Sequence, residues 1–441
     1  MKRFLSFILL TSVFLSSCKK PDYQSILNDP NLYSRTVYEL NGVVMGNNFP
    51  PVVASRNYAY ATVAGYEVIA GGYPEKYKSL AGQLNGLEKV AKPGTGQTID
   101  YPYAALLAFC RVGEAVTFPE GSLKYYTDSL HRLAVSHGMP QEMIASSEAY
   151  AKAVAASILA WSKKDNYLKL RSAPKFAVND SAGRWVPTPP AYSEAVEPHW
   201  GNIRTMVIHD LKYFSPPPPP PFNIKDKNSK YYQEVMAVKN AVDSLTPEQV
   251  HIADFWDDNP GKLNISGHVM FITKKFSPSG HWMSIVGIAS KKTKADYNTT
   301  VCAYAKTAIA MFDAFIECWT AKYAYKTARP ETVINKYFDP NWRPHLQTPP
   351  FPEYTCGHST ISTAAAEALT SVFGDNLAYT DTTELEFGVK NRSFKSFRAA
   401  ALENTWARFY GGIHYHNSCI VANHFGTMIG DSVVKKLVMK Q

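Results

Sequence analysis

Three short stretches near the C-terminus of this 441-residue chain together offer the groups that hold a tetrahedral oxyanion such as phosphate or vanadate. They are residues 322–330, 355–358 and 408–414. In chain order the groups are Lys322, Arg329, Gly357, His358, Arg408 and His414. Arginine forks suit bidentate contact with an oxyanion, and imidazoles can move protons or ligate a metal. Paired bases and Gly-His turns are common alone, so it is their combination that indicates one site.

Helices must position these groups. Ile309, Phe312 and Ile316 recur at helical spacing and predict a helix that runs into Lys322. If this helix persists, Lys322 and Arg329 share one face, being about two turns apart, and the following proline ends the helix.

The second and third stretches also lie at predicted helix starts. The Ala-rich residues 359–372 predict a helix directly after Gly357 and His358, so free N–H groups of its first turn would face the anion. His414 would open a further helix that reaches about Lys436.

The rest of the chain is also predominantly helical in pattern. Residues 52–70, 103–115 and 141–161 are apolar with helical spacing, and strand alternation is scarce. Pro-rich loops separate the helices, and the proline run 216–221 is expected to be an extended surface spacer, either an internal loop or a boundary between helical layers. The prediction is an all-α helical bundle with long Pro-rich loops.

Composition narrows the classes of function. Hydrophobic residues make up 45% of the chain, enough for a large core, and the formal net charge of +9 could draw anionic ligands by a general field. No basic stripe with interleaved aromatic residues is present, so nucleic acid is not an expected partner.

The first 18 residues resemble a bacterial lipoprotein signal. Lys2 and Arg3 precede a short apolar run that ends in Leu-Ser-Ser-Cys18. In such a signal the cysteine is diacylated, which would hold an exported protein on a membrane facing the periplasm or the cell surface. The alternative is an ordinary cleaved signal with an incidental cysteine.

Five further cysteines remain, an odd number that cannot pair completely within one chain. They are Cys110, Cys302, Cys318, Cys356 and Cys419. Cys302 and Cys318 are expected to be buried as small hydrophobic residues.

The three stretches resemble the signature of the superfamily that joins type 2 phosphatidic acid phosphatases with vanadium-dependent haloperoxidases. That signature reads K-x6-R-P, P-S-G-H and S-R-x5-H-x3-D. The resemblance is wider on the haloperoxidase side, because residues 255–258, 280–283 and 348–354 also look like bacterial members, the iodide-preferring ones most of all. It implies a helical haloperoxidase/acid phosphatase fold with residues 19–295 as an N-terminal helical region and 296–441 as the core that carries the site.

The resemblance implies a role for each residue of the site. Lys322, Arg329 and Arg408 would neutralise vanadate oxygens, position 356 and the Gly357 amide would also contact the anion, and His414 would ligate vanadium. His358 would act as acid/base toward hydrogen peroxide, and Trp319 and Phe351 resemble residues on the halide side, with plain core packing as the alternative. The implied activity is oxidation of iodide or bromide by hydrogen peroxide.

Two other functions use the same residues. In a phosphatase, His414 would attack the phosphorus of a phosphoester and His358 would protonate the leaving alcohol, with phosphate in the vanadate site. The protein could also be an oxyanion-binding lipoprotein without catalysis. The sequence does not predict an oligomeric state.

Four signature positions differ in this chain. Thr355, Cys356, Ala407 and Ser418 replace the usual Pro, Ser, Ser and Asp. Loss of the Asp should leave His414 a less basic ligand, unless His416 or Asn417 substitutes. A thiol is a poor donor to an anion and is open to oxidation, unless Cys356 is protected, for instance by pairing with Cys419.

A second copy of the P-S-G-H motif lies at residues 278–281. It precedes Lys322, whereas the anion-binding motif follows the lysine, and no Ala-rich helix follows it. We interpret it as a loop near the pocket and not as the anion seat.

Overall fold

The structure is a computed structural model that describes residues 22–441. The expected signal segment and its lipidation residue Cys18 lie outside the described residues. No helix in the described range is both long and apolar enough to cross a membrane.

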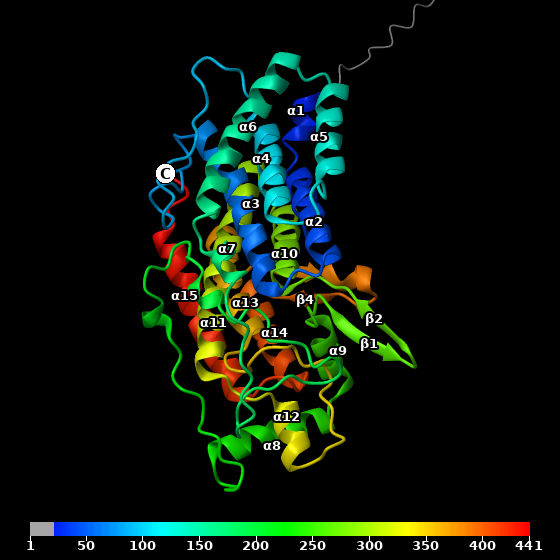
Figure 1. The fold of residues 1–441 in the computed structure, drawn as a ribbon. Coiled ribbons are helices and arrows are strands. Elements are labelled where there is room, and N and C mark those ends of the chain that lie inside the picture. Colours follow the sequence, from blue (N-terminus) through cyan, green and yellow to red (C-terminus); the bar gives the residue numbers. More distant parts are fainter. Residues whose placement is uncertain (1–21) are drawn as a thin grey trace, which may run out of the picture.

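The all-α prediction is confirmed, because helices form the bulk of the molecule (Figure 1). The helices of the first half are α1 (Tyr23–Leu27), α2 (Pro30–Gly46), α3 (Pro51–Gly72), α4 (Tyr101–Val116), α5 (Lys124–Ser136), α6 (Gln141–Ser162), α7 (Tyr167–Leu170), α8 (Lys230–Asp243) and α9 (Pro247–Phe255). Those of the second half are α10 (Pro278–Thr293), α11 (Tyr297–Tyr325), α12 (Pro330–Tyr337), α13 (Gly357–Phe373), α14 (Phe397–Tyr410) and α15 (His416–Lys436). Short 3-10 turns are η1 (Trp200–Asn202), η2 (Leu211–Phe214) and η3 (Thr383–Phe387).

Local sequence explains where many of these helices begin. Proline occupies the first turn of α2, α3, α4, α9, α10 and α12, where its missing N–H costs no hydrogen bond. Asp100, Ser277, Asp296 and Ser396 cap α4, α10, α11 and α14 by accepting from an amide of the first turn.

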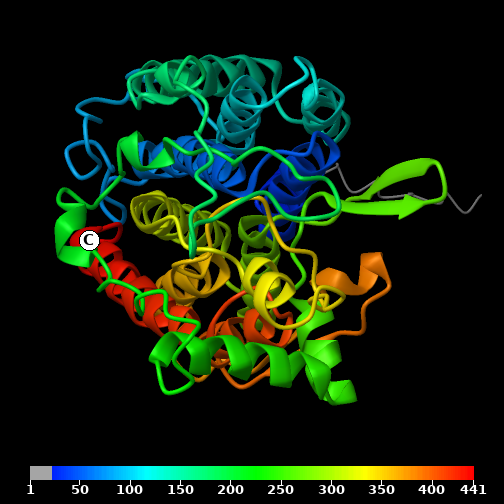
Figure 2. The ribbon, with the colours of Figure 1, turned by 60° about the horizontal axis from the view of Figure 1, so that its bottom comes forward.

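The helices pack in layers (Figure 2). One outer layer holds α4, α5 and α6; then come α2 and α3; then α10, α11 and α13; and α14 and α15 lie beyond. Every residue of α3 from Val52 to Ala70 is buried, as expected for a helix with neighbours on all sides. One hydrophobic core includes residues on both sides of position 296, and the domain boundary proposed there stays a prediction.

Two small antiparallel sheets interrupt the helical pattern. β1 (Lys262–Ser266) and β2 (Val269–Thr273) form a hairpin that projects from the bundle (Figure 1). β3 (Tyr379–Asp381) pairs with β4 (Arg392–Phe394). The base of the projecting hairpin is fixed by Gln347, whose side chain exchanges two hydrogen bonds of 2.9 and 3.0 Å with the backbone of Leu263.

The proline run 216–221 adopts neither helix nor strand. The Tyr325 hydroxyl donates to the Pro216 carbonyl at 3.0 Å, and the Tyr354 hydroxyl donates to the Pro217 carbonyl at 2.6 Å. The run is therefore tied to the end of α11 and to the segment between α12 and α13, which carries part of the candidate site.

Candidate oxyanion site

The predicted site residues converge on one cavity. It has a volume of about 200 Å³ and is lined by Trp319, Phe351, Gly357, His358, Arg408 and His414 among others. Lys322 and Arg329 lie beside it, since both cationic groups lie over the Phe351 ring, at 5.2 and 5.0 Å from its centroid. Residues from three separate stretches thus meet at one place, as the sequence predicted.

The second stretch forms the N-terminus of α13, as expected. Cys356 is the capping residue, with extended backbone, and Gly357 is the first helical residue. No side chain among residues 22–441 caps this helix, so its first N–H groups remain available to an anion. A Cβ added at Gly357 would lie 3.6 Å from Trp319 and 4.0 Å from Lys322, inside the same site.

The third stretch spans the end of α14 and the turn that follows it, and it completes the site. Arg408 lies in the last turn of α14, and a Gly411-Gly412 turn leads to His414. Gly412 has a φ of 76°, and an added Cβ would lie 2.8 Å from Val242, so only glycine fits this turn. The helix α15 begins at His416, two residues later than expected, which leaves His414 in the connecting segment.

The first stretch departs from the prediction. The helix α11 ends at Tyr325, Lys326 adopts a left-handed conformation with φ of 54°, and Arg329 caps the new helix α12. Lys322 and Arg329 therefore do not share a helix face, and that prediction was wrong. A left-handed residue ends a helix by turning the chain, and here it returns Arg329 to the site from a second direction.

Lys322 supports the site's backbone. Its fully buried ammonium donates to the carbonyls of Pro352 and Glu353 at 3.0 and 2.9 Å, and also to that of Thr355. Burial, together with the charge of Arg329, lowers its pKa to about 8. Lys322 thus holds the segment before α13 and places a cation next to the cavity, with its three N–H groups engaged by carbonyls.

Arg329 has one group left for a ligand. Its Nε donates to the Phe351 carbonyl at 2.9 Å, and its Nη1 donates to the Ile413 carbonyl at 2.8 Å and to His414 Nε2 at 3.1 Å. Its Nη2 is buried and has no hydrogen-bond partner among the described residues. Burial lowers the pKa of the guanidinium to about 10, so it remains charged at neutral pH.

The tautomer of His414 follows from its two neighbours. Arginine can only donate, so Nε2 of His414 accepts from Arg329 and carries a lone pair. The opposite nitrogen, Nδ1, lies 2.8 Å from Glu353 Oε1 and donates to it. Glu353 is 1% exposed and also accepts from the Tyr415 amide at 3.3 Å. A carboxylate behind an imidazole makes the free nitrogen a better metal ligand.

Glu353 corrects the expectation that His414 lacks a carboxylate partner. Ser418 does not hydrogen-bond to His414, since its buried hydroxyl has no hydrogen-bond partner within residues 22–441. Asn417 accepts from Lys230, and His416 stacks on Trp406. The sequence signal that was missed is an acidic residue inside the apolar run 348–354, just before the glycine turn.

His358 is placed as a proton acceptor. Its Nε2 is buried without a hydrogen-bond partner in the described part of the chain, and lies 3.8 Å from Asp258 Oδ2. Burial, and then the positive charge of Arg408, lower the pKa of His358 well below 6.5. The imidazole is therefore neutral at pH 7 in the anion-free protein.

Cys356 directly precedes Gly357, which lines the cavity. It is fully buried and packs against Cys419 and Ala422. Burial opposes ionisation of the thiol, but hydrogen bonding with Cys419 lowers its pKa well below 9. All five cysteines of residues 22–441 are free and buried, so the structure contains the Cys356–Cys419 contact without a disulfide.

Trp319 and Phe351 form an aromatic wall of the cavity. Their rings lie 4.9 Å apart, and the Trp319 indole donates to the Val196 carbonyl at 3.2 Å. Their position beside the anion-binding groups is as expected, and their role toward a halide stays a prediction.

Several buried donors of the site await a partner. Arg329 Nη2, Arg408 Nε and Ser359 Oγ are all without one among the described residues. Buried polar groups are normally paired, so this gathering fits a ligand with several acceptor oxygens. A tetrahedral oxyanion offers such oxygens, and its central atom would replace the Arg329 N–H on the lone pair of His414 Nε2.

As predicted, the second P-S-G-H motif is not the anion-binding site. The prediction that it forms a loop was wrong. It forms the first turn of α10, where the space beside Gly280 is filled by Asn41, 2.2 Å from an added Cβ. His281 is fully buried between Asp258 and Asp381, whose charges would repel an anion. Pro278 lines the cavity, so the motif does lie near the pocket.

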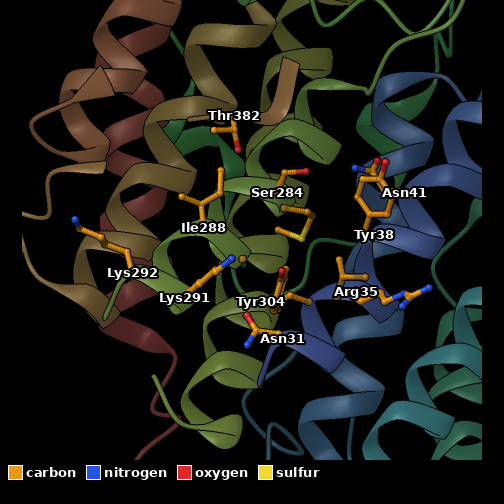
Figure 3. A pocket seen from close by; sticks show the side chains of 14 residues that line it. Asn31, Arg35, Tyr38, Asn41, Ser284, Ile288, Lys291, Lys292, Tyr304 and Thr382 are labelled. Atoms are coloured by element: carbon orange, nitrogen blue, oxygen red, sulfur yellow. The ribbon is translucent and has the colours of Figure 1, made fainter. Parts of the chain in front are cut away.

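A larger cavity of about 760 Å³ lies elsewhere, against α2 and α10 (Figure 3). Arg35, Lys291 and Lys292 line it, together with Tyr38 and Asn41. None of the predicted site residues belongs to it, so its size does not make it the reactive site.

Known proteins resemble both the sequence and the fold. A family model described as the VCPO second helical-bundle domain matches residues 303–341 and 337–440. A bacterial vanadium-dependent iodoperoxidase structure is 42% identical, with a TM-score of 0.87, and the match covers 93% of this chain and 97% of that one.

Two further structures share the fold at lower identity. They are the holo and apo forms of a bacterial vanadium-dependent chloroperoxidase, both 16% identical. Their TM-scores are 0.65 and 0.66, covering 87% and 88% of this chain and 91% and 94% of those chains. No curated protein sequence matches the chain.

Proposed function

We propose that this chain, which belongs to the family of vanadium-dependent haloperoxidases, oxidises iodide or bromide with hydrogen peroxide to the hypohalous acid. The overall reaction consumes a halide, a proton and hydrogen peroxide and yields hypohalous acid and water. The observation that carries the proposal is the lone pair of His414 Nε2, set beside unpartnered donors of Arg329 and Arg408 among the described residues.

The residues fit vanadate as the cofactor. Arg329, Arg408 and the first amides of α13 would bind its oxygens, Lys322 would contribute charge, and His414 would be the protein ligand. When bound, vanadate supplies a Lewis-acid centre that activates peroxide toward a nucleophilic halide without a change in metal oxidation state. Glu353 orients His414 and strengthens it as a ligand.

His358 is the acid/base of the proposal. A neutral imidazole beside the cavity can take a proton from incoming hydrogen peroxide. The same group can return that proton when water leaves. An anion in the site would raise the pKa of His358 again, because it offsets the charge of Arg408.

Iodide is the proposed preferred halide. The Trp319–Phe351 wall offers a polarizable surface for a large, weakly hydrated anion, and the iodoperoxidase is 42% identical. Neighbouring cations would offset its charge.

A phosphatase reaction is the second candidate, favoured by the same Nε2 lone pair. An unprotonated His414 could attack a phosphoester, with phosphate oxygens held as proposed for vanadate. A non-catalytic oxyanion-binding protein would use the same groups without turnover.

We also propose that Cys18 is lipidated and that an exported protein is anchored to a membrane facing the periplasm or the cell surface. The support is the basic start, apolar run and Leu-Ser-Ser-Cys18 pattern. Wild type should fractionate with membranes and Cys18→Ala should not. Equal fractionation would contradict the anchor.

Parallel assays separate the catalytic candidates. Purified protein with orthovanadate, peroxide and iodide should form triiodide, whereas p-nitrophenyl phosphate without vanadate should not be hydrolysed. Phosphate release without iodide oxidation would contradict the proposal. Vanadate binding with neither activity would leave the non-catalytic alternative.

A further inference from the structure

The second P-S-G-H motif places a buried histidine between two carboxylates. Nδ1 of His281 lies 2.7 Å from Asp258 Oδ1, and Nε2 lies 2.9 Å from Asp381 Oδ2. An ionised carboxylate can only accept, so both ring nitrogens donate and the ring is an imidazolium. The site chemistry described above does not use this residue.

The surroundings of His281 support its charge. Burial opposes it, but Asp258 and Asp381 raise the pKa of His281 well above 6.5. The ring also stacks on Trp256, with centroids 4.7 Å apart and planes 20° apart. Glu384 lies 3.7 Å from Nδ1 and is itself paired with Lys275 at 3.1 Å.

Asp258 connects this cluster to the catalytic cavity. One of its oxygens, Oδ1, is held by His281, and the residue is 1% exposed. The other oxygen, Oδ2, is buried 3.8 Å from His358 Nε2. Neither of these two atoms has a hydrogen-bond partner among residues 22–441, so a small adjustment would join them.

We propose that His281 is a positioning residue that fixes Asp258 so that its free oxygen accepts the Nε2 proton of His358. With Nε2 protonated, Nδ1 of His358 carries the lone pair and becomes the nitrogen that accepts a proton in the cavity. Asp381 holds His281 from the other side, so the order is Asp381, His281, Asp258, His358. The inference rests on the proposed function, because it assigns the proton-accepting nitrogen of that reaction.

The fixed orientation matters because a free imidazole exchanges between two tautomers. A carboxylate behind one nitrogen selects the tautomer whose other nitrogen can act as base. Without His281, the Asp258 side chain would lose the donor that anchors its first oxygen. Its second oxygen would then no longer be directed at His358.

The direct test is 15N NMR of histidine-labelled protein without vanadate, followed by steady-state kinetics with vanadate. In wild type, His281 should be protonated at both nitrogens and His358 at Nε2. In Asp258→Asn the amide can donate to His358, so His358 should switch to the Nδ1-protonated tautomer. In His281→Gln a mixture of both His358 tautomers is expected.

Asp381→Asn is the variant that keeps volume and fold. Its amide can donate to Nε2 of His281, so His281 should become neutral while it still donates from Nδ1 to Asp258. The kcat for iodide oxidation should fall by roughly 10–100-fold in Asp258→Asn and His281→Gln, with KM for iodide within about twofold. A smaller kcat loss is expected in Asp381→Asn.

Asp165→Asn is the matched control. It breaks the buried Arg56–Asp165 pair of 2.7 Å, which lies outside the cavity, so it should lower stability without changing the His358 tautomer. An unchanged His358 tautomer in His281→Gln would overturn the inference. So would a wild-type His281 bound to a metal ion, a possibility raised by the closeness of Asp258, His281 and Glu384.

The two readouts separate this inference from the proposed function. Absence of iodide oxidation by wild type would remove the proposed function, whereas the tautomers of the vanadate-free protein would still decide the role of His281.

Discussion

At the scale of single residues, the side chains that support the anion-binding groups differ from those of the family signature. His414 lacks the usual Asp four residues later, and Glu353, which precedes it by 61 residues, accepts from its Nδ1. The usual Ser is Cys356, which precedes the first turn of α13 and packs against Cys419. Each replacement can be tested alone.

Glu353→Gln tests the carboxylate behind His414. An amide can still accept from Nδ1 but carries no charge, so His414 becomes a weaker ligand. Vanadate affinity measured by calorimetry should fall roughly 10–100-fold. Ser418→Ala is the control and should leave the affinity unchanged, because the serine occupies the position of the usual Asp but forms no hydrogen bond to His414 among residues 22–441.

Cys356→Ser tests the thiol. A hydroxyl donates to an anion oxygen more strongly than a thiol, by about 1 kcal/mol, so vanadate should bind about fivefold more tightly. Cys302→Ala, at a buried cysteine that packs near Met439, is the control for general core effects. Unchanged affinity in Cys356→Ser would mean that residue 356 does not face the anion.

At the scale of elements, the site depends on the close packing of α13 and α15. Gly426 of α15 lies against α13, and a Cβ there would lie 2.2 Å from the Thr360 carbonyl. The first turn of the same helix α13 carries Gly357 and His358. Separation of these helices should therefore affect both stability and the anion seat.

Gly426→Ala should destabilise the protein by about 1–3 kcal/mol and also weaken vanadate binding. Thermal unfolding and calorimetry measure the two effects. The control is Gly42→Ala in α2, where a Cβ meets no atom within 4 Å of described residues. This control should stabilise by about 0.5–1 kcal/mol and leave binding unchanged. Equal behaviour of both variants would contradict the packing argument.

The same elements show which features of the fold and of the site can be predicted from the sequence. The helices around residues 52–70, 103–115, 141–161 and 359–372 follow from apolar spacing, and the structure contains them. The break after Tyr325 does not follow, because a left-handed lysine at 326 has no glycine to signal it. Glu353 and Asp258 act on partners far along the chain, and contacts of that range carry no local spacing signal.

At the scale of the whole molecule, buried carboxyls make stability depend on pH. Burial raises the pKa of Asp313 to about 6, of Glu67 to about 7 and of Glu317 to about 8. Folded protein therefore holds these protons to higher pH than the unfolded chain. Each of these carboxyls contributes fully to the free energy of unfolding below its ordinary pKa. This contribution is lost as the pH rises through the raised pKa of the folded state.

Glu317→Gln should remove one part of this dependence. Near pH 4 both proteins are neutral at this position and should unfold at similar temperatures. By pH 8 wild type bears the cost of a buried charge, so the variant should melt a few degrees higher. Glu142→Gln on the exposed surface of α6 is the control, and a constant difference for Glu317→Gln at all pH values would contradict the assignment.

The central claim for the whole protein is that one vanadate, held through His414, supports halide oxidation. The direct measurement is a titration of metal-free protein with orthovanadate while triiodide formation is followed at fixed peroxide and iodide. The rate should rise from near zero and saturate at one vanadate per chain, phosphate should compete, and His414→Ala should show no rate at any vanadate concentration. Iodide oxidation that is independent of vanadate, or that survives in His414→Ala, would contradict the account.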